Sequence, residues 1–500
     1  MHTRKSIITD YFNEAALTRD AWKARNSYYY SRLEKIIAAH VEKNRSVLEL
    51  GCGTGDLLAA ARPSRGVGID ISTKMVEAAQ RKYPKFTFLA QDAESLDLSE
   101  KFDYIIISDL IGHLSDIWGS LKNLHSVCHK DTKVIITYYN FVWEPVLRLA
   151  EKLNLKMRQG YQNWLGRQDI RNFLYLTDFS VEKEGVDILL PKRVPLFSRV
   201  CNDYLSQTML FRWASLLQYF VAMPYSSQAE QSLACSVIVP TRNERNNIDD
   251  CVSRIPAMGA HTEIIFVDGA STDGTQEKIE EAIIRQKGKK DIKLVNQVPS
   301  EQEKRINAID GNRVTMLKLG KGDAVRKGFD KASGDILMIL DADLTVPPED
   351  LPKFYHALAS KKADFVNGSR LVYPLEDEAM PVVNYFGNKF FSLLFTWLLE
   401  QPIKDTLCGT KALRKKDYEA IKNGRSYFGD FDPFGDFDLL FGAARQKMKI
   451  IEMPIAYKRR RFGYTKVQVY KHGLLLLKMS FIAFMKLKLR KWLFIFIRKN

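Results

Sequence analysis

Short apolar runs separated by polar, glycine-containing turns recur along most of this chain. Nine of these runs predict strands, at 46–50, 67–70, 86–90, 102–108, 134–137, 235–240, 263–268, 314–319 and 336–340. The run at 336–340 has no polar alternation, which is typical of a strand buried on both faces of a parallel sheet. Residues Tyr28 to Val41 have the three-and-four spacing of an amphipathic helix. Strands that alternate with helices predict an α/β fold.

The 500 residues are too many for one ordinary hydrophobic core, so we expect two domains of about 150 to 250 residues each. One short stretch of small and polar residues, Ser226–Ser232, separates two strongly patterned regions. We therefore predict two doubly wound α/β domains, at 1–225 and 234–470, joined by a linker at 226–233 and followed by a tail at 471–500.

Two carboxylates follow the buried run at 336–340. Asp341 and Asp343 fall where this strand leaves the sheet, and open α/β sheets bind ligands at that edge. Carboxylate oxygens suit Mg2+ or Mn2+, so this corner predicts a metal site facing a diphosphate. The same spacing occurs twice more within 430–438, and for any single such pair a turn or a helix cap is the plainer interpretation.

The first predicted strand runs into a glycine-rich loop. Gly51, Gly53 and Gly55 let the backbone approach a ligand, and the helix that follows directs its N-terminus toward it. The second strand ends at Asp70, which can accept hydrogen bonds from both hydroxyls of a ribose. The third strand is followed by Asp92, which can bond the exocyclic amine of an adenine. These features predict a nucleotide-like cofactor.

The segment Glu49–Gly55, together with Asp70 and Asp92, resembles the successive motifs of class I S-adenosylmethionine-dependent methyltransferases. The resemblance implies a Rossmann-like methyltransferase domain in which these positions bind the methyl donor: Glu49, Gly51, Gly53, Gly55, Asp70 and Asp92. A nicotinamide-dependent dehydrogenase is the alternative, but the order of the acidic residue and the glycines, and the third-strand aspartate, favour the methyl donor.

The methyl acceptor is not readable from the sequence, because methyl transfer from a sulfonium needs alignment more than strong acid or base. His113 lies just after the fourth predicted strand, where the family often places residues near the methyl group. It is a candidate catalytic base for a sugar hydroxyl, with a purely structural role in closing a helix or loop as the alternative.

The second half resembles the family 2 glycosyltransferases of the GT-A fold, within their polyprenyl-phosphate (dolichyl-phosphate mannosyltransferase-like) branch. The matching segments are 240–244, 267–275, 321–326, 341–343 and 368–370. The resemblance implies a metal on Asp341 and Asp343 and a nucleotide-sugar site made of Pro240, Glu244, Asp268, Lys321, Asp341, Arg370, Arg460 and Lys466. Two departures, Gly269 where a second aspartate is common and Asp323 at a usually small position, make the nucleotide preference harder to infer.

Residues 427–440 thread four acids through four phenylalanines. An inverting sugar transferase that acts on a hydroxyl needs a carboxylate to take its proton, and the family commonly places that acid in this late segment. Asp436 is the first candidate and Asp438 the second. With a lipid phosphate as acceptor the nucleophile is already anionic, and these acids would position the metal, the sugar or the loop instead. Capping of a helix that starts near Leu439 is the structural alternative.

The net charge of +16 is concentrated at the carboxyl end of the chain. Residues 453–500 hold thirteen lysines and arginines and no acid, interleaved with leucine, phenylalanine and tryptophan. Charges interrupt each apolar run before it reaches the roughly 20 residues that span a bilayer. The tail is therefore predicted to lie on a membrane surface, with a helix packed on its own domain as the alternative. The apolar helix predicted at Asn384–Leu399 fits a lipid interface, with burial against the sheet as the alternative, and together with the tail it favours a lipid acceptor.

Composition narrows the remaining classes. The chain is 46% hydrophobic and 27% charged, as globular chains are, and its first thirty residues carry no secretory signal. Six cysteines without metal-ligand spacing predict reduced, mostly buried thiols. No recognition fold for nucleic acid is visible, so we expect no nucleic-acid partner.

From the sequence we therefore predict a bifunctional enzyme on the cytoplasmic face of a membrane. S-adenosylmethionine would serve methyl transfer in the first domain. Mg2+ or Mn2+ would serve inverting transfer from a nucleotide sugar to a polyprenyl phosphate in the second, as part of glycan or cell-envelope polysaccharide synthesis. Two alternatives stay open: the acceptor is a sugar hydroxyl of a growing glycan, or one half is catalytically silent and acts as a binding module.

Overall fold

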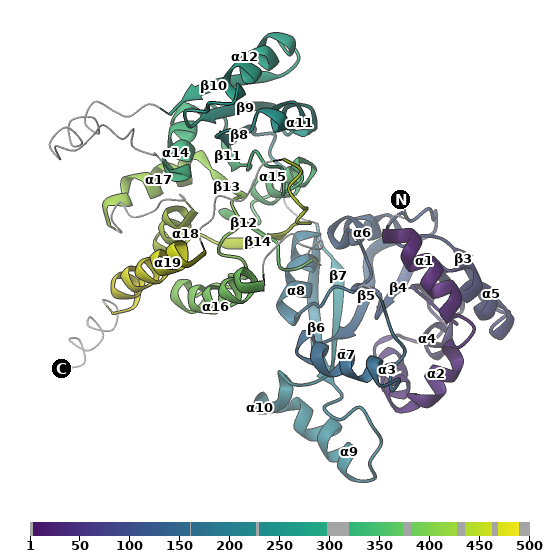
Figure 1. Cartoon of the computed structure of the whole chain (residues 1–500). Helices are drawn as coiled ribbons and strands as arrows, with labels where there is room; N and C mark the ends of the chain where they lie inside the picture. Colours follow the sequence, from purple (N-terminus) through teal and green to yellow (C-terminus); the bar gives the residue numbers. More distant parts are fainter. Residues whose placement is uncertain are drawn as a thin grey trace. The chain divides into compact units, whose positions relative to one another are not determined.

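The computed structural model describes residues 4–160, 162–226, 230–297, 320–373, 382–427, 436–462 and 469–489. The chain divides into two compact units, Met1–Ser227 and Gln228–Asn500, and each contains its own seven-stranded sheet (Figure 1). Both units are doubly wound α/β folds, as the sequence predicts. All six cysteines are free thiols and buried.

The sheet of the first unit has the strand order β3-β2-β1-β4-β5-β7-β6. Strands β1 to β5 are parallel, and β7 runs antiparallel to both β5 and β6. The strands are β1 (Ser46–Leu50), β2 (Arg65–Asp70), β3 (Thr87–Ala90), β4 (Phe102–Ser108), β5 (Cys128–Tyr139), β6 (Phe179–Asp187) and β7 (Leu217–Pro224). The chain winds outward from β1 to β3 and then returns to place β4 beside β1. A ligand crevice is expected at this reversal, beyond the carboxyl ends of β1 and β4.

The helices of the first unit pack around this sheet, and α1 lies beside α5 (Figure 1). Their apolar faces join the sheet in a core that includes Ile37 of α3 and Leu58 of α4, both fully buried. The helices are α1 (Arg4–Ala15), α2 (Arg19–Arg25), α3 (Ser27–His40), α4 (Asp56–Ala60), α5 (Thr73–Lys82), α6 (Ile117–Asn123), α7 (Glu144–Lys152), α8 (Arg167–Leu176), α9 (Phe197–Arg199) and α10 (Met209–Arg212).

The sheet of the second unit has the order β10-β9-β8-β11-β13-β12-β14, with β13 antiparallel to its neighbours β11 and β12. Its strands are β8 (Ala234–Thr241), β9 (His261–Asp268), β10 (Asp291–Asn296), β11 (Ile336–Ile339), β12 (Phe365–Ser369), β13 (Lys411–Arg414) and β14 (Ile450–Pro454). The winding direction reverses between β8 and β11, so the corresponding crevice faces Asp341.

The helices of the second unit include two apolar ones, α16 and α19, which contact each other. The helices are α11 (Ile248–Arg254), α12 (Thr275–Arg285), α14 (Lys321–Lys331), α15 (Leu351–Ala359), α16 (Val382–Leu399), α17 (Lys415–Asn423), α18 (Asp436–Arg445) and α19 (Val469–Ala483). Within the described ranges, no helix combines the length and the apolar character needed to cross a bilayer.

Eight of the nine predicted strands coincide with strands of the structure, and the run at 314–319 lies outside the described residues. None of the nine predicted runs covers β6, β7, β10 or β12 to β14. β10 is an edge strand that is only partly buried, so its apolar signal is weak. β13 is fully packed but begins and ends with basic residues, Lys411 and Arg414, which do not read as a buried strand.

Candidate active sites

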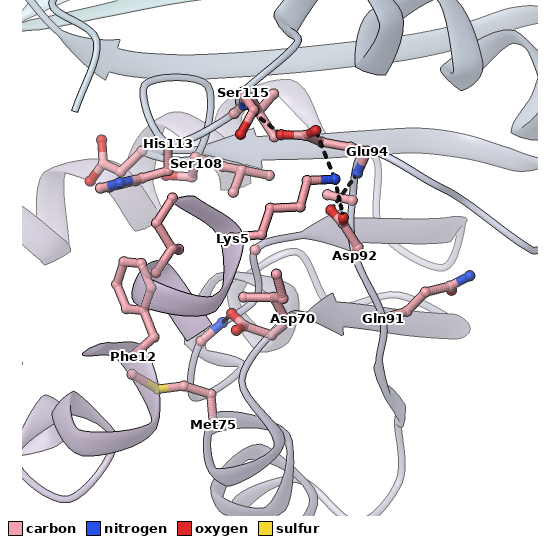
Figure 2. Close-up of a pocket in the computed structure, with 18 of the residues that line it drawn as sticks. Lys5, Phe12, Asp70, Met75, Gln91, Asp92, Glu94, Ser108, His113 and Ser115 are labelled. Carbon is pink, nitrogen blue, oxygen red and sulfur yellow. Dashed lines mark hydrogen bonds and ion pairs between the residues drawn. The ribbon is translucent and has the colours of Figure 1, made fainter. Parts of the chain in front are cut away.

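A pocket lies at the carboxyl ends of the parallel strands in the first unit (Figure 2). Five of the residues selected from the sequence line it: Gly51, Gly53, Asp70, Asp92 and His113. A second pocket adjoins it across Gly51 and Gly53 and includes Glu49. Both pockets lie where β1 and β4 end, at the reversal of the winding direction.

Asp70 and the glycine-rich loop hold each other in place. The carboxylate of Asp70 accepts one hydrogen bond from the backbone N–H of Gly53 and another from that of Ser72, each 2.9 Å long. Burial raises the pKa of Asp70, while these two hydrogen bonds oppose the rise. Gly53 has a φ of 51°, and the space where a β-carbon would stand is empty. A ligand can therefore approach the Gly53 backbone directly.

Glu49 supports the loop from behind. Its side chain is buried, and its carboxylate accepts a hydrogen bond of 2.9 Å from the backbone N–H of Leu58, in the first turn of α4. Burial raises the pKa of Glu49 to about 8, against the charge of Lys23. This contact fixes the start of α4 relative to β1, so the role of Glu49 in the structure is to position the loop.

Asp92 is held by a lysine from the first helix (Figure 2). The Nζ atom of Lys5 lies 2.6 Å from a carboxylate oxygen of Asp92 and 2.9 Å from one of Glu94. Sequence reasoning missed Lys5, because nothing in α1 indicates that it reaches the third strand. The ammonium group of Lys5 therefore engages the carboxylate that was predicted to bind the adenine amine.

We expect the substitution Lys5→Gln to strengthen binding of the methyl donor by up to about fivefold, because an exposed ion pair contributes at most about 1 kcal/mol that the adenine must displace. Calorimetric titration with S-adenosylhomocysteine measures the change. The matched control is Lys74→Gln on α5, an exposed lysine with no acid within ion-pair distance among the described residues, which should leave the affinity unchanged. Weaker binding by the Lys5 variant would show that Lys5 contacts the ligand.

Two titratable side chains follow β4. The ring of His113 is mostly buried and meets the ring of Phe12 edge-on, with 5.3 Å between the ring centres. Asp109 has a φ of 53° and accepts hydrogen bonds of 2.9 and 3.1 Å from the hydroxyl of Tyr29. Burial raises the pKa of Asp109 to about 6. The sequence analysis gave Asp109 no role, although a carboxylate directly after a strand is the signal that selected Asp70.

Arg19 lines both pockets, and it is the third residue that sequence reasoning missed. Its Nε atom is buried without a hydrogen-bond partner. In the described part of the chain, no carboxylate lies within ion-pair distance of its guanidinium. Arg19 as a whole is half-buried, and its guanidinium approaches the sulfur of Met157 at 3.9 Å and the ring of Tyr30 at 5.8 Å. Neither contact neutralises its charge, so an anionic group of a ligand would be favoured beside Arg19, near Gly51 and Gly53.

In the second unit, each of the two predicted metal ligands meets a cation. The Nζ atom of Lys321 lies 2.5 Å from Asp341, and Arg460 forms an ion pair with Asp343. Burial tends to raise the pKa of Asp341, but the charges of Lys321, Lys411 and Arg370 hold it below its ordinary value. Asp341 is therefore ionised and surrounded by positive charge.

Arg370 belongs to a buried network. Its guanidinium donates to both carboxylate oxygens of Asp405, at 2.7 and 2.9 Å, and lies over the ring of Tyr457. The amide of Asn388, on α16, donates to the same carboxylate at 2.8 Å. Asp405 is fully buried and was not selected from the sequence. Lys411, also fully buried and unselected, donates to the carbonyl of Cys408.

The predicted base and ribose ligands lie at or just after the ends of β8 and β9, which are neighbours in this sheet. Asp268, at the end of β9, accepts a hydrogen bond of 2.5 Å from the hydroxyl of Ser271. Pro240 and Thr241 end the neighbouring strand, and Thr241 is in register with Asp268. Glu244 follows β8 and accepts a hydrogen bond of 2.8 Å from the side chain of Asn247.

The late acidic segment is only partly described. Asp438 is buried and forms an ion pair of 2.7 Å with Arg425. Helix α18 begins at Asp436, three residues earlier than the predicted start near Leu439. Residues 428–435 and Lys466 lie outside the described residues.

Comparison with known families follows the same division of the chain. Residues 47–131 match the family described as methyltransferase domain, and residues 236–421 match glycosyl transferase family 2. The first unit thus contains a segment similar to methyltransferase domains, and the second a segment similar to family 2 glycosyltransferases; the two units are named below by these similarities. The glycosyltransferase match extends from β8 to β13, and its residue range includes the two predicted metal ligands, Asp341 and Asp343.

Individual relatives match one domain at a time. The dolichol-phosphate mannosyltransferase of Pyrococcus furiosus is 31% identical over 238 residues, 47% of this chain and 59% of that protein. The polyprenol monophosphomannose synthase of Mycolicibacterium smegmatis is 27% identical over 241 residues, 46% of this chain and 80% of that protein. A solved S-adenosylmethionine-dependent methyltransferase from Thermotoga maritima, a possible histamine N-methyltransferase, aligns at 14% identity and a TM-score of 0.37, over 43% of this chain and 99% of that one.

The glycosyltransferase domain has donors that fit a divalent cation. Asp341 and Asp343 place carboxylate oxygens at one corner, and Mg2+ commonly takes only one or two carboxylates, with phosphates and water completing its shell. Among the described residues, no cluster of three or more acidic, histidine or cysteine side chains forms a fully protein-built metal site. The two aspartates thus fit a metal that is held jointly with the diphosphate of a substrate.

Glu452 gives the glycosyltransferase domain a pH dependence of defined sign. Burial raises the pKa of Glu452 to about 8, although the backbone N–H groups of Lys404 and Asp405 donate to its carboxylate. The folded domain keeps a proton that the unfolded chain releases above pH ~4, so the free energy of unfolding falls as the pH rises toward ~8. In the variant Glu452→Gln, the free energy of unfolding should fall by about 2 kcal/mol less, or by a still larger difference, over the same pH range. Denaturant unfolding at several pH values measures this.

Proposed function

We propose that this chain is a bifunctional enzyme. The first domain would transfer a methyl group from S-adenosylmethionine, and the second would transfer a sugar, with inversion, from a nucleotide sugar to a polyprenyl phosphate. The observation that carries the second activity is the pair of aspartates at the sheet reversal that each contact a cation: Lys321 lies 2.5 Å from Asp341, and Arg460 pairs with Asp343. Carboxylates and cations side by side suit a diphosphate with its metal and an anionic acceptor.

In the methyltransferase domain, Asp70 would take the ribose hydroxyls and Asp92 the adenine amine, after Lys5 moves aside. The bound donor supplies an electrophilic methyl group. Arg19, unpaired beside the glycine-rich loop, would hold the carboxylate at the other end of the donor. His113 or Asp109 would accept the proton of the methyl acceptor, because both line the pocket just after β4.

In the glycosyltransferase domain, Glu244 and Asp268 would bind the base and ribose of the nucleotide sugar beside Pro240. Asp341 and Asp343 would hold the metal, and Lys321, Arg370, Arg460 and Lys466 would face phosphates. A polyprenyl phosphate is already anionic and needs no base. If the acceptor were a sugar hydroxyl instead, Asp436 or Asp438 would have to take its proton.

Contact with a membrane would bring the lipid acceptor to this domain. Helices α16 and α19 present exposed apolar side chains, among them Leu393, Trp397, Leu474 and Phe481. The ring of Trp397 stacks on Phe484, which joins the two exposed faces, and Lys486 and Lys488 add positive charge beside them. We propose peripheral attachment to the cytoplasmic face through this surface, in glycan or cell-envelope polysaccharide synthesis.

The test is sugar transfer from a panel of nucleotide sugars with Mn2+ or Mg2+, with and without a short polyprenyl phosphate. We expect transfer to the lipid phosphate that requires metal and is lost in Asp343→Ala. Asp92→Ala is the matched control: it should abolish binding of the methyl donor and leave sugar transfer intact. Nucleotide-sugar binding without lipid-dependent turnover would favour the hydroxyl acceptor. Failure of every nucleotide sugar to bind would contradict the glycosyltransferase proposal.

A further inference from the structure

In the segment that connects β6 to β7, polar side chains are buried and large apolar side chains are exposed, which is the reverse of the usual arrangement in a globular protein. The segment runs from Ile188 to Leu216 and contains α9 and α10 (Figure 1). Its small and polar side chains point inward and are buried: Ser198, Cys201, Asn202 and Ser206. Ile188 and Leu216 at its two ends are buried, but several large apolar side chains between them are exposed, with exposed fractions of 86% for Leu196, 96% for Met209, 71% for Leu210 and 63% for Trp213. We call this segment the inverted insertion.

The outward orientation is fixed by the buried polar contacts. The side chain of Asn202 accepts hydrogen bonds from the backbone N–H groups of Leu189 and Leu190, both 2.8 Å, and donates to the hydroxyl of Tyr28 at 2.9 Å. At the end of the insertion, the backbone carbonyl of Trp213 accepts from Asn140 at 2.7 Å. These hydrogen bonds hold the backbone of the inverted insertion in a defined conformation. The exposure of its apolar side chains therefore follows from the fold.

The charge of this surface is positive. Lys192, Arg193, Arg199 and Arg212 lie among the exposed apolar residues, and between 192 and 213 the only acid is Asp203. Asp203 is already engaged by Arg32 of α3, at 2.5 Å. Arg199 lies 3.9 Å from Asp203, and Arg212 lies 4.0 Å from Glu184, which two further arginines also contact, so cations outnumber acids at this surface. Exposed leucine, methionine and tryptophan beside an excess of arginine and lysine make the composition that settles into the boundary of an anionic bilayer.

We infer that the inverted insertion docks the methyltransferase domain onto an anionic lipid surface. So many exposed large apolar side chains in one short segment are unusual on a soluble domain, and the cations of the same segment complement anionic lipid headgroups. Helix α3 connects this surface with the pocket, because it carries both Arg32, which holds the insertion, and Tyr30, which lines the pocket. This inference does not depend on the proposed function.

A single labelled cysteine tests the docking. Since all six native cysteines are buried, Met209→Cys can be labelled selectively in the full chain with a dye whose emission reports the polarity around it. We expect a shift of emission to shorter wavelength on vesicles of phosphatidylcholine with phosphatidylglycerol, and quenching by lipids that carry spin labels on their acyl chains. Glu77→Cys, an exposed position on α5, is the control and should not respond.

The dye reports only the polarity around residue 209, so its response is independent of any membrane attachment through α16 and α19. On the labelled background, Arg193→Gln with Arg199→Gln should weaken the lipid response about tenfold or more, because each charge near an anionic surface contributes about 1 kcal/mol. A dye that stays in water while the chain sediments with the vesicles would overturn the inference. Emission at shorter wavelength in the absence of lipid would also overturn the inference. If that shift depended on protein concentration, a second copy of the chain would cover the surface; if it did not, another part of the same chain would cover it.

Discussion

Replacing Gly409 by alanine is expected to lower the rate of sugar transfer by at least about a hundredfold while the domain stays folded. A β-carbon at this position would overlap both the Nζ atom of Lys321 and the carboxylate of Asp341. The two charged groups would have to move apart, and displacement of a catalytic group by about 1 Å commonly has an effect of this size. Initial rates of transfer to a polyprenyl phosphate, under the conditions of the proposed assay, measure it.

Two controls separate misplacement from misfolding. Gly387→Ala, on α16, adds the same methyl group where nothing lies within 4 Å, and it should transfer sugar at the wild-type rate. Methyl-donor binding by the first domain of Gly409→Ala should also be unchanged. If Gly409→Ala transfers sugar normally, then Lys321 and Asp341 do not need their present arrangement, and the assignment of this corner to the diphosphate fails.

The second large effect concerns stability. The variant Asp405→Asn should lower the free energy of unfolding of the second domain by about 3 to 5 kcal/mol, because it leaves the buried guanidinium of Arg370 without its counter-charge. Burial works against ionisation of Asp405, but the charge of Arg370 lowers its pKa to about 2. The stabilisation that the ionised Asp405 gives the folded domain is therefore fully present at pH values above about 4, the ordinary pKa of an aspartate. It is lost as the pH falls toward 2.

Denaturant unfolding of the full chain, followed by a probe in the second domain, measures this change. The matched control is Glu349→Gln, which breaks the exposed ion pair between Arg254 and Glu349 and should change the free energy of unfolding by no more than about 1 kcal/mol. Equal effects of the two substitutions would mean that the buried pair contributes no more than a surface pair.

The sequence predicted those parts of the sites that follow a strand directly. Asp70, Asp268 and Asp341 were found because a buried apolar run ends immediately before each of them, and parallel strands bring their carboxyl ends to one edge. The same rule would have found Asp109. The fold class was predictable for the same reason, since long runs of buried strands alternating with helices leave few other architectures.

The rest depends on contacts between distant parts of the chain, which no local pattern encodes. Lys5 meets Asp92 across 87 residues, and Asp405 meets Arg370 across 35. The inverted insertion shows a further limit. Its Leu196 and Met209 read as core residues in the sequence, and only the packing shows that small polar side chains took the interior in their place.

The division into two units has a consequence for how the protein is made. Each unit is one uninterrupted segment, so the ribosome finishes the first before it begins the second. In the first unit, Val47 of β1 pairs with Tyr104 of β4, and Val134 of β5 pairs with Ala222 of β7. The middle of the sheet is therefore complete only after most of the segment has emerged from the ribosome. Domains generally fold as units from the N-terminus during synthesis. We therefore expect the nascent methyltransferase domain to be protease-resistant and able to bind its donor while the sugar-transferring half is still being translated.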